Sequence, residues 1–554
     1  MLKDFFSKTT RACSLIFLFA SLADPVSAQT ASHPHFEKQG SRTVLLVNNK
    51  PFLILGAELH NSSTSNLPYM DTIWPRLVQM NLNTVLAPLS WESIEPNEGK
   101  FDFSLVDGLI AKARQNKLKL VFLWFASWKN LVSTYTPAWV KNNPERFPLH
   151  INKSGERYQM LSAFSAEGML ADSKAFAALM KHIKQVDAVE QTVIMMQVEN
   201  EVGTSSDERD CSKIANDFYE GQVPEKLLGY LTENKLNLTP SFNEVWGNNG
   251  YKTRGSWKEI FGEGPSNEIF MSWYLASYIG EVIRAGKAEY NIPMYVNAAI
   301  GRQNGKMGTY PSGSPLPFVM DVWRAAAPQL DMLSPDIYFG IFTDFCRAYT
   351  QSGNPLFIPE TRGGEFGAAN ALIAIGNYNA IGFSPFGIDG RFEDTAAGIP
   401  SVYKALQQLS PILLKSESLR QMIAVSLDTS KKNSTLTLGS YQVDCNLQGW
   451  PSSPGSSTLG YAIIIETGKD EFFVAGKNIS LQFSLKDNKD KITGIEWAEE
   501  GKFNKEVWVP GRRLNGDEIM VNYSLSNLFK EGKSGNGLRF MNKVSIQKVK
   551  LYQY

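Results

Sequence analysis

Short apolar runs alternate with longer amphipathic stretches from about residue 42 to residue 419. Continuous apolar runs are typical of buried strands, and apolar residues three and four positions apart are typical of helices. The alternation predicts repeated strand-then-helix units around a parallel sheet. The predicted strands are 52–59, 84–91, 119–126, 192–200, 293–300, 332–339, 355–360 and 380–387, and the clearest predicted helices are 103–117, 172–186 and 267–290.

Eight strands with crossover helices over roughly 370 residues fit a (β/α)₈ barrel, the TIM barrel, with long loops. A doubly wound open sheet is the alternative α/β architecture. It is less favoured because no GxGxxG follows the first strand and no GxxxxGK[ST] occurs in the chain.

The pattern changes after 403–419, where short β-type runs are separated by Gly, Asn and Asp. These runs include 460–468, 470–476, 479–485 and 542–554. They predict a smaller, antiparallel all-β domain, sandwich-like, over 420–554. The barrel domain is then expected over 29–419.

The first 28 residues have the order of a secretory signal peptide. Three basic residues flank or precede the apolar run "ACSLIFLFASLA", and "VSA" stands before Gln29. This order predicts cleavage after Ala28 and a periplasmic or secreted protein. A membrane anchor is the weaker alternative because the run is shorter than the roughly 20 residues that span a bilayer. No later segment is long and apolar enough to span one.

Composition narrows the class of ligand. The chain of 554 residues has 55 basic and 55 acidic residues, so no strong net field is available to attract nucleic acid. Beyond residue 28 only Cys211, Cys346 and Cys445 remain, without CxxC spacing, and the five histidines form no HExxH motif. No metal or other cofactor is expected. Neutrality and 12% aromatic residues suit a neutral ligand.

Two glutamates follow predicted strands directly. Glu201 ends the fourth strand in "TVIMMQVENEVG", and Glu360 ends the seventh in "PLFIPETRGG". The carboxyl ends of barrel strands form the mouth where catalysis occurs. Strands four and seven can bring two carboxyl groups to about 5 Å, the separation of a retaining glycosidase. An ionised Glu360 would then raise the pKa of Glu201, as an acid requires. The alternative is a surface carboxylate or a structural ion pair for either residue.

The segment "QVENEVG" resembles the Asn-Glu signature of clan A glycoside hydrolases, in the form found in glycoside hydrolase family 35, the β-galactosidases. "FIPETRGG" and "LNTVLAPLSWESIEPNEGKFDF" (82–103) are similar to the family's strand-seven and strand-two segments. The resemblance covers most of 45–415. It implies Glu201 as acid/base, Glu360 as nucleophile and Asn200 as a ligand of the sugar 2-hydroxyl. The β domain resembles that of the bacterial branch that degrades plant polysaccharides.

Further residues at predicted strand ends are candidates for substrate contacts. Tyr338 is expected either to donate a hydrogen bond to Glu360 or to be a core aromatic. Trp91, Trp124 and Trp128 are expected to stack on sugar faces or to pack in the core. Candidates for sugar hydroxyls are Glu58, His60, Glu92 and Asn297, and Arg362 is a candidate partner of Glu360. The segment "GAELHNSS" keeps the family's His at position 60 but lacks its Tyr and Arg, which bears on the sugar specificity.

Glu199 lies two residues before Glu201, so strand alternation places it on the same face. It is expected to have a structural role and to pair with a basic group inside the barrel.

These features predict a retaining exo-β-galactosidase that acts on terminal β-galactosyl residues, with the side chains of a plant polysaccharide such as xyloglucan as a substrate. A β-glucosidase or an α-arabinofuranosidase with the same mechanism is one alternative. A carbohydrate-binding barrel without turnover is another. The sequence leaves the oligomeric state and the role of the β domain open.

Overall fold

The computed structural model describes residues 33–204, 207–300, 307, 309–390, 397–415, 421–448, 458–488, 490–521 and 535–554. The predicted signal peptide, residues 1–28, lies outside the described residues. Within these ranges, no helix has the length and apolar character needed to cross a membrane.

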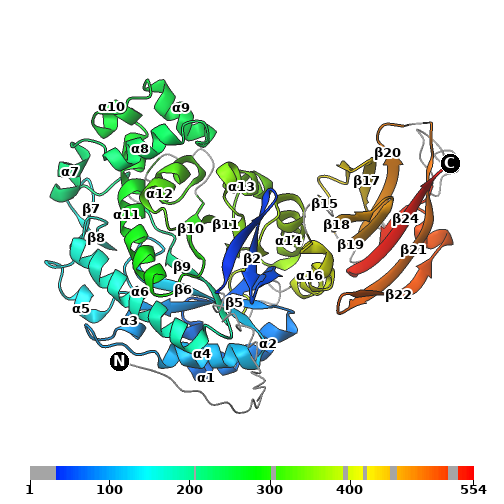
Figure 1. Ribbon diagram of the computed structural model, residues 1–554, viewed down its shortest axis with the longest axis horizontal. Coiled ribbons are helices and arrows are strands. Elements are labelled where there is room, and N and C mark those ends of the chain that lie inside the picture. The colour runs from blue at the N-terminus through cyan, green and yellow to red at the C-terminus, as the bar shows by residue number, and fades with distance from the viewer. Residues whose placement is uncertain are drawn as a thin grey trace, which may run out of the picture. The chain divides into compact units, whose positions relative to one another are not determined.

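Parallel strands form the barrel (Figure 1), and each predicted run overlaps at least one of them. They are β4 (Ile54–Glu58), β5 (Thr84–Ser90), β6 (Lys119–Lys129), β9 (Val193–Asn200), β10 (Met294–Ala299), β11 (Met332–Ile337), β12 (Phe357–Ile358), β13 (Glu360–Thr361) and β14 (Gly382–Phe383). The (β/α)₈ prediction is confirmed.

The ring closes at the seventh position, where Pro359 separates two short strands. Before the proline, β12 pairs with β14; after it, β13 pairs with β11. Proline has no backbone N–H to donate to a ladder, which fits a strand that changes partner at this point. Glu360 is therefore the first residue of β13, and it is 6% exposed.

Helices follow the strands, and three of them match the predicted segments 103–117, 172–186 and 267–290. They include α4 (Ser104–Gln115), α6 (Ala166–Asp187), α11 (Ser266–Glu289), α12 (Met320–Ala326), α13 (Phe342–Tyr349), α14 (Gly364–Tyr378) and α16 (Ile399–Leu413). Helix α6 begins before the predicted residue 172 because Ser165 caps it, its side chain accepting the N–H of Gly168.

Several elements were not predicted. Short helices are α1 (Leu67–Asp71), α2 (Trp74–Gln79), α3 (Trp91–Ile94), α5 (Ala138–Lys141), α7 (Lys213–Tyr219), α8 (Glu225–Glu233), α9 (Pro240–Asn248) and α10 (Trp257–Phe261). Helices α7 to α10 form an insertion between β9 and α11. A hairpin of β7 (Leu149–Ile151) and β8 (Arg157–Leu161) follows β6, and β1 (His35–Gln39), β2 (Arg42–Val47) and β3 (Lys50–Phe52) form an antiparallel sheet before the barrel.

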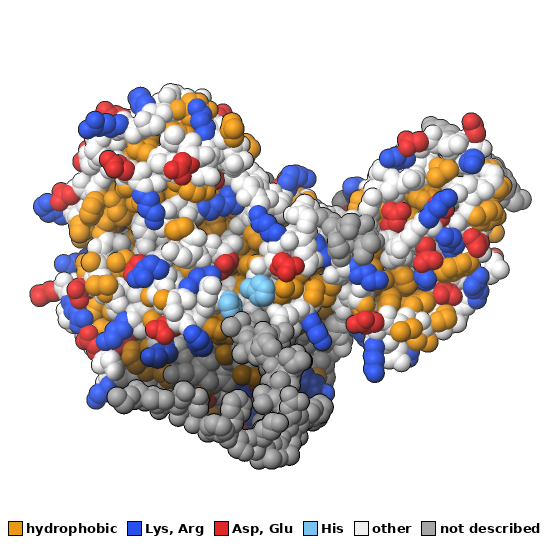
Figure 2. Space-filling model, viewed as in Figure 1, with side chains coloured by type: hydrophobic (Ala, Val, Ile, Leu, Met, Phe, Trp, Pro, Cys, Tyr) orange, Lys and Arg blue, Asp and Glu red, His pale blue; other side chains and the backbone are white. Residues whose placement is uncertain are grey.

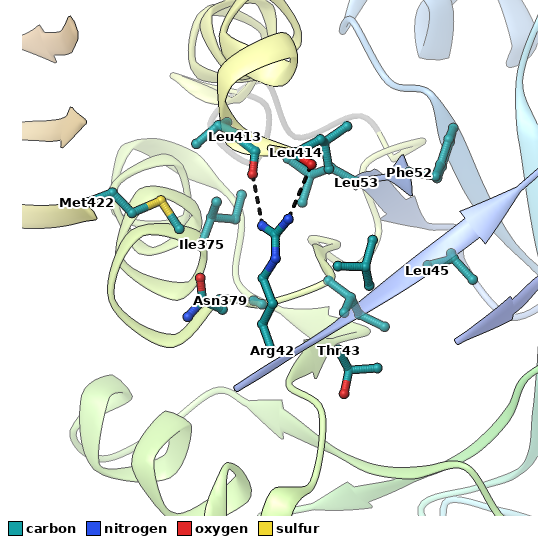
Figure 3. A pocket seen from close by; sticks show the side chains of 13 residues that line it. Arg42, Thr43, Leu45, Phe52, Leu53, Ile375, Asn379, Leu413, Leu414 and Met422 are labelled. Carbon is teal, nitrogen blue, oxygen red and sulfur yellow. Dashed lines mark hydrogen bonds between the residues drawn. The ribbon is translucent and has the colours of Figure 1, made fainter. Parts of the chain in front are cut away.

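Arg42 ties this first sheet to the last barrel helix. Its guanidinium donates hydrogen bonds to the carbonyl oxygens of Leu413 and Leu414, at 3.1 and 3.2 Å (Figure 3). The bonds satisfy carbonyls at the end of α16. The surrounding pocket is lined by residues that precede β4 and β14, such as Leu53 and Ile381. It therefore lies at the amino ends of the strands, opposite the mouth.

The C-terminal part is a β-sandwich, as predicted. One sheet contains β15 (Gln421–Asp428), β18 (Leu459–Gly468), β19 (Glu471–Lys477), β24 (Ser545–Gln553), β21 (Thr493–Asn504) and β22 (Val507–Leu514). The other contains β16 (Asn433–Leu438), β17 (Tyr441–Leu447), β20 (Ile479–Leu485) and β23 (Leu538–Phe540). Apolar side chains of both sheets, such as Ile464 and Leu481, form one core.

Helix α14, which follows the Glu360 strand, is held by the sandwich. Asn377 exchanges two hydrogen bonds with the backbone of Ala424, at 2.7 and 3.0 Å, and Glu365 pairs with Lys477 at 2.8 Å. The surface seen in Figure 2 intersperses acidic and basic side chains, in line with the balanced composition.

Candidate active site

Three carboxyl groups converge at the mouth of the barrel. Glu201 follows β9, Asp336 lies near the end of β11, and Glu360 begins β13. One carboxyl oxygen from each lies within 4.8 Å of the others. For Glu201 and Glu360 this separation matches the arrangement of about 5 Å in retaining glycosidases, and it is shorter than the roughly 6.5–9.5 Å of inverting enzymes. Three such oxygens are also a set that could hold a metal ion.

The end of β9 has an unusual backbone that aims Glu201. Both Glu199 and Glu201 have positive φ, 60° and 46°. Non-glycine residues in this region are strained and are often found at functional sites. The N–H of Glu201 donates to Oδ1 of Asn297 at 3.0 Å, and the amide of Asn297 donates to Asp336 at 2.7 Å. Asn297 therefore positions Glu201 and Asp336, and the prediction that it contacts sugar hydroxyls finds no support.

Glu360 is held by the tyrosine that the sequence singled out. The phenol of Tyr338 donates to Oε1 of Glu360 at 2.6 Å, which is the first of the two alternatives that the sequence left open. The other oxygen, Oε2, has no hydrogen-bond partner among the described residues. Burial raises the pKa of Glu360, while Lys129, Tyr338 and Asn200 lower it. Tyr338 thus favours the ionised carboxylate that a nucleophile needs.

Lys129, the last residue of β6, is a central residue of the site that sequence reasoning missed. It is 5% exposed, and its ammonium donates to Oδ1 of Asn200 at 2.9 Å and to Asn130 at 2.6 Å. It lowers the pKa of four carboxyl groups, those of Glu58, Glu201, Asp336 and Glu360. The available signal was a lysine directly after the apolar run "FLWFASW".

The pKa of Glu201 is raised to about 7. Burial is the first cause and the charge of Glu360 the second, while Lys129 and a hydrogen bond with Asp336 lower it. The predicted direction is therefore correct, but desolvation outranks the like-charge repulsion that the sequence argument invoked. Near neutral pH a substantial fraction of Glu201 is protonated, as a general acid requires.

Glu58, at the end of β4, is fully buried, and neither of its carboxyl oxygens has a partner in the part of the chain that the structure describes. Its pKa lies well above the usual range, chiefly through burial and then through the charge of Glu360. The amide nitrogen of Asn200 is likewise without a hydrogen-bond partner among the described residues, although the amide lowers the pKa of Glu360. Buried polar groups normally have partners, so these atoms are available to a ligand.

His60 lies at the mouth, where Asp389 fixes its ring. Nδ1 of His60 lies 2.9 Å from Oδ1 of Asp389, which also accepts the backbone N–H of His60 at 3.1 Å. Ser63 donates to the other oxygen of Asp389 at 2.5 Å. The side chain of His60 is 45% exposed. It remains a candidate for substrate contact, and Asp389 was not predicted.

The three tryptophans do not form sugar platforms, which corrects that prediction. Trp91, Trp124 and Trp128 are fully buried in the barrel core. Their indole N–H groups donate to Glu95, Asp172 and the carbonyl of Leu161, respectively, at 2.8–3.0 Å. Trp124 packs on Phe176 of α6 and Trp128 on Tyr278 of α11. Large aromatic side chains at these positions fill the layer between strands and helices.

The side chain of Glu199 lies in the layer between the strands and the helices, and it does not pair with a basic group among the described residues. Its carboxyl group accepts the backbone N–H groups of Ser127 and Trp128, at 3.2 and 2.6 Å. Burial and then Asp172 raise its pKa well above the usual range. The prediction of a face shared with Glu201 is wrong, because the positive φ values at the end of β9 break the strand alternation.

Two other candidates form no ion pair or hydrogen bond with the carboxyl cluster in the part of the chain that the structure describes. Glu92 is half exposed and pairs with Lys141 at 3.0 Å, so it is a surface ion pair. The guanidinium of Arg362 lies over the ring of Phe339, 5.4 Å from its centroid.

A barrel with two facing carboxyl groups at the ends of its fourth and seventh strands has the architecture of a retaining glycoside hydrolase. The model of a β-galactosidase family, glycoside hydrolase family 42, matches residues 69–269. Residues 399–526 match the model of a domain of unknown function (DUF5597). The first match is to a β-galactosidase family, as the sequence resemblance implied, but to family 42 rather than family 35, and it covers less than half of the chain.

The solved structures that match this chain include two β-galactosidases. That from the psychrophilic Marinomonas ef1 has 13% identity and a TM-score of 0.43, over 66% of this chain and 61% of that one. The β-galactosidase from Bacillus circulans sp. alkalophilus has 14% identity and a TM-score of 0.45, over 66% of this chain and 57% of that one. The catalytic domain of a β-amylase from Paenibacillus polymyxa has 11% identity and a TM-score of 0.44, over 62% and 94%.

The chain thus spans about three fifths of the length of the two β-galactosidases. No curated protein matches it.

Proposed function

We propose that this chain is a retaining exo-β-galactosidase. The observation that carries the proposal is the pair of carboxyl groups of Glu201 and Glu360, with oxygens within 4.8 Å at the mouth of the barrel. The match of residues 69–269 to a β-galactosidase family supports the choice of sugar.

In the first step the ionised carboxylate of Glu360 attacks the anomeric carbon of the galactosyl residue. Glu201 donates its proton to the glycosidic oxygen, so the leaving group departs as an alcohol and a covalent galactosyl-enzyme forms. The pKa of about 7 keeps that proton available near neutral pH. Tyr338 holds Glu360 through the hydrogen bond of 2.6 Å.

In the second step Glu201, now ionised, takes a proton from water, which attacks the same carbon and releases Glu360. Two inversions return galactose in the β configuration. The amide nitrogen of Asn200, which Lys129 orients through the amide oxygen, binds the sugar 2-hydroxyl. Glu58 and His60 are the further substrate ligands in this proposal.

The finer parts of the proposal concern substrate and location. As the substrate we propose terminal galactosyl residues of a plant polysaccharide such as xyloglucan. The order of residues 1–28 supports secretion or a periplasmic location, with a barrel domain over 29–419 and a sandwich over 420–554.

The test is turnover of nitrophenyl β-galactoside by the protein, by Glu360→Gln and by the matched variant Glu92→Gln. We expect Glu360→Gln to lose a factor of at least roughly 10²–10⁴, the range for a positioned catalytic group, and Glu92→Gln to keep wild-type turnover. Equal turnover by Glu360→Gln would remove it as nucleophile.

Azide distinguishes the two glutamates. Glu360→Ala rescued by azide should yield the α-galactosyl azide, and Glu201→Ala the β-galactosyl azide, because each vacancy admits azide to a different face. Faster turnover of the matching β-glucoside or α-arabinofuranoside would show that the preferred sugar is glucose or arabinofuranose instead of galactose. Tight galactose binding without turnover of any glycoside would favour the binding protein.

A further inference from the structure

Large apolar side chains are exposed at the mouth beside the catalytic pair. Phe339 is 61% exposed and Ile341 58%, and both follow β11; Phe366, in the first turn of α14, is 61% exposed and follows β13. Exposed apolar side chains that gather at one place often mark an interaction site. We call these three residues the apolar rim. Because the three tryptophans are buried, they cannot stack on a sugar at the mouth. The side chains of the apolar rim can.

The apolar rim is continuous with the proposed reaction centre. Phe339 follows Tyr338, whose ring centroid lies 6.5 Å from that of Phe339 and whose phenol bonds Glu360. Strands β11 and β13 pair directly, so the segments that follow them, which bear the rim, begin side by side. Arg362, between Glu360 and Phe366 in the chain, covers the ring of Phe339 at 5.4 Å. A ligand that reaches Glu360 therefore passes close to Phe339.

The polar atoms without partners indicate which part of the substrate lies where. Going round the ring from Glu360 through β14, β4, β5 and β6 to β9, the mouth carries Glu58 and Lys129. The unpartnered oxygens of Glu58 can accept hydroxyl hydrogens of the sugar that is cleaved. The opposite arc, through β11 and β10, carries Asp336, whose Oδ1 has no hydrogen-bond partner among the described residues, and Phe339 and Ile341 follow the end of β11. The exposed side chains of Phe339 and Ile341 offer contact area to a sugar ring.

We propose that Phe339, Ile341 and Phe366, with Arg362, bind the sugar rings on the leaving-group side of an oligosaccharide. The inference rests on the proposed function, because it assumes that the glycosidic bond to be cleaved lies between the carboxyl groups of Glu201 and Glu360. The C–H face of a sugar stacks on the ring of Phe339, and the guanidinium of Arg362 donates to its hydroxyl groups. The occupant is a neutral saccharide, and the rim sets the preference for substrates with at least one sugar beyond the cleaved bond.

The experiment compares two substrates that differ in the leaving group. β-Galactosyl fluoride places a single atom there, whereas lactose places a sugar ring. For Phe339→Ala we expect the ratio of kcat/KM for lactose to kcat/KM for the fluoride to fall about tenfold, as loss of part of a buried aromatic contact predicts. Phe339→Trp should restore the ratio. Tyr554→Ala, which removes an exposed aromatic ring from the sandwich, is the matched control and should keep it.

An unchanged ratio in Phe339→Ala would overturn the inference, while absent turnover of the fluoride by wild type would reject the proposed function instead. If the wild type has no turnover, a binding measurement tests the role of the apolar rim. Calorimetry with lactose on Glu360→Gln, with and without Phe339→Ala, should show affinity about tenfold lower in the double variant. Equal affinities, or no binding to either variant, would overturn the inference without reference to turnover.

Discussion

The ammonium of Lys129 donates a hydrogen bond to the amide oxygen of Asn200 at 2.9 Å, and both side chains are buried at the mouth of the barrel. The bond fixes which end of the Asn200 amide faces the site, so its nitrogen is presented to a ligand. The same ammonium lowers the pKa of Glu201 and Glu360. One lysine therefore orients Asn200, the proposed ligand of the sugar 2-hydroxyl, and lowers the pKa of both carboxyl groups of the proposed catalytic pair.

Lys129→Met should raise the pKa values of both glutamates, since their nearby positive charge is lost. An opposite charge at close range lowers a carboxyl pKa by about 1–3 units, so the acidic limb of the pH–rate profile should move up by about one unit or more. Profiles of kcat/KM for nitrophenyl β-galactoside measure the shift. Lys141→Met, which removes the surface partner of Glu92, is the control and should leave the profile in place. Identical profiles would show that Lys129 has no electrostatic role.

The pH dependence of wild-type turnover should be bell-shaped, because Glu360 must be ionised and Glu201 protonated. The pKa of Glu201, raised to about 7, predicts that activity declines as pH rises through about 7. Glu201→Gln should lose this basic limb with β-galactosyl fluoride, whose departure needs no proton from the protein. A wild-type profile that stays flat from pH 5 to pH 8 would contradict the two-carboxylate mechanism.

The sequence predicted the barrel because its strands are continuous apolar runs, and it predicted Glu201 and Glu360 because they follow two of these runs directly. It missed Lys129 because β6 continues past residue 126, with an irregular register against β9 between Trp124 and Lys129. It misplaced Glu199 because the positive φ at Glu199 and Glu201 has no signature in residue type. Asp389 was missed because it lies in a loop that tertiary contacts bring to His60.

Glu58→Gln should stabilise the protein at alkaline pH and reduce its activity. The folded pKa of Glu58 is raised above the unfolded value, so its contribution to stability is present at low pH and is lost as pH rises through the folded pKa. A neutral amide of the same shape avoids that loss. Thermal unfolding at pH 5 and pH 8 should show a higher Tm for the variant at pH 8 only.

A surface carboxyl group whose pKa is lowered, rather than raised, should behave differently. Arg146 lowers the pKa of Glu98, so Glu98→Gln should give no gain of Tm at pH 8. A lower Tm at pH 8 for Glu58→Gln would mean that its ionised carboxylate has a stabilising partner.

Removal of metal ions should leave turnover unchanged. The oxygens of Glu201, Asp336 and Glu360 lie within 4.8 Å of one another and could hold a cation. Lys129 already supplies positive charge to this cluster, and the proposed chemistry needs a protonated Glu201, which a bound cation would oppose. Dialysis against a chelator, followed by assay with and without added Ca²⁺, Mg²⁺ or Zn²⁺, is the measurement. Activity lost on dialysis and restored by one of these ions would establish a metal requirement.

Asn297→Ala should impair turnover without removing a group that touches the substrate. Asn297 accepts the N–H of Glu201 and donates to Asp336, so the variant frees the strained segment that aims the proposed acid. We expect kcat to fall roughly 10-fold to 100-fold with little change in KM, since displacement of a catalytic group by about 1 Å has effects of that size. With β-galactosyl fluoride, which needs no acid, the loss should be smaller. Equal losses with both substrates would mean that Asn297 acts by holding Asp336 or by stabilising the fold, rather than by positioning Glu201.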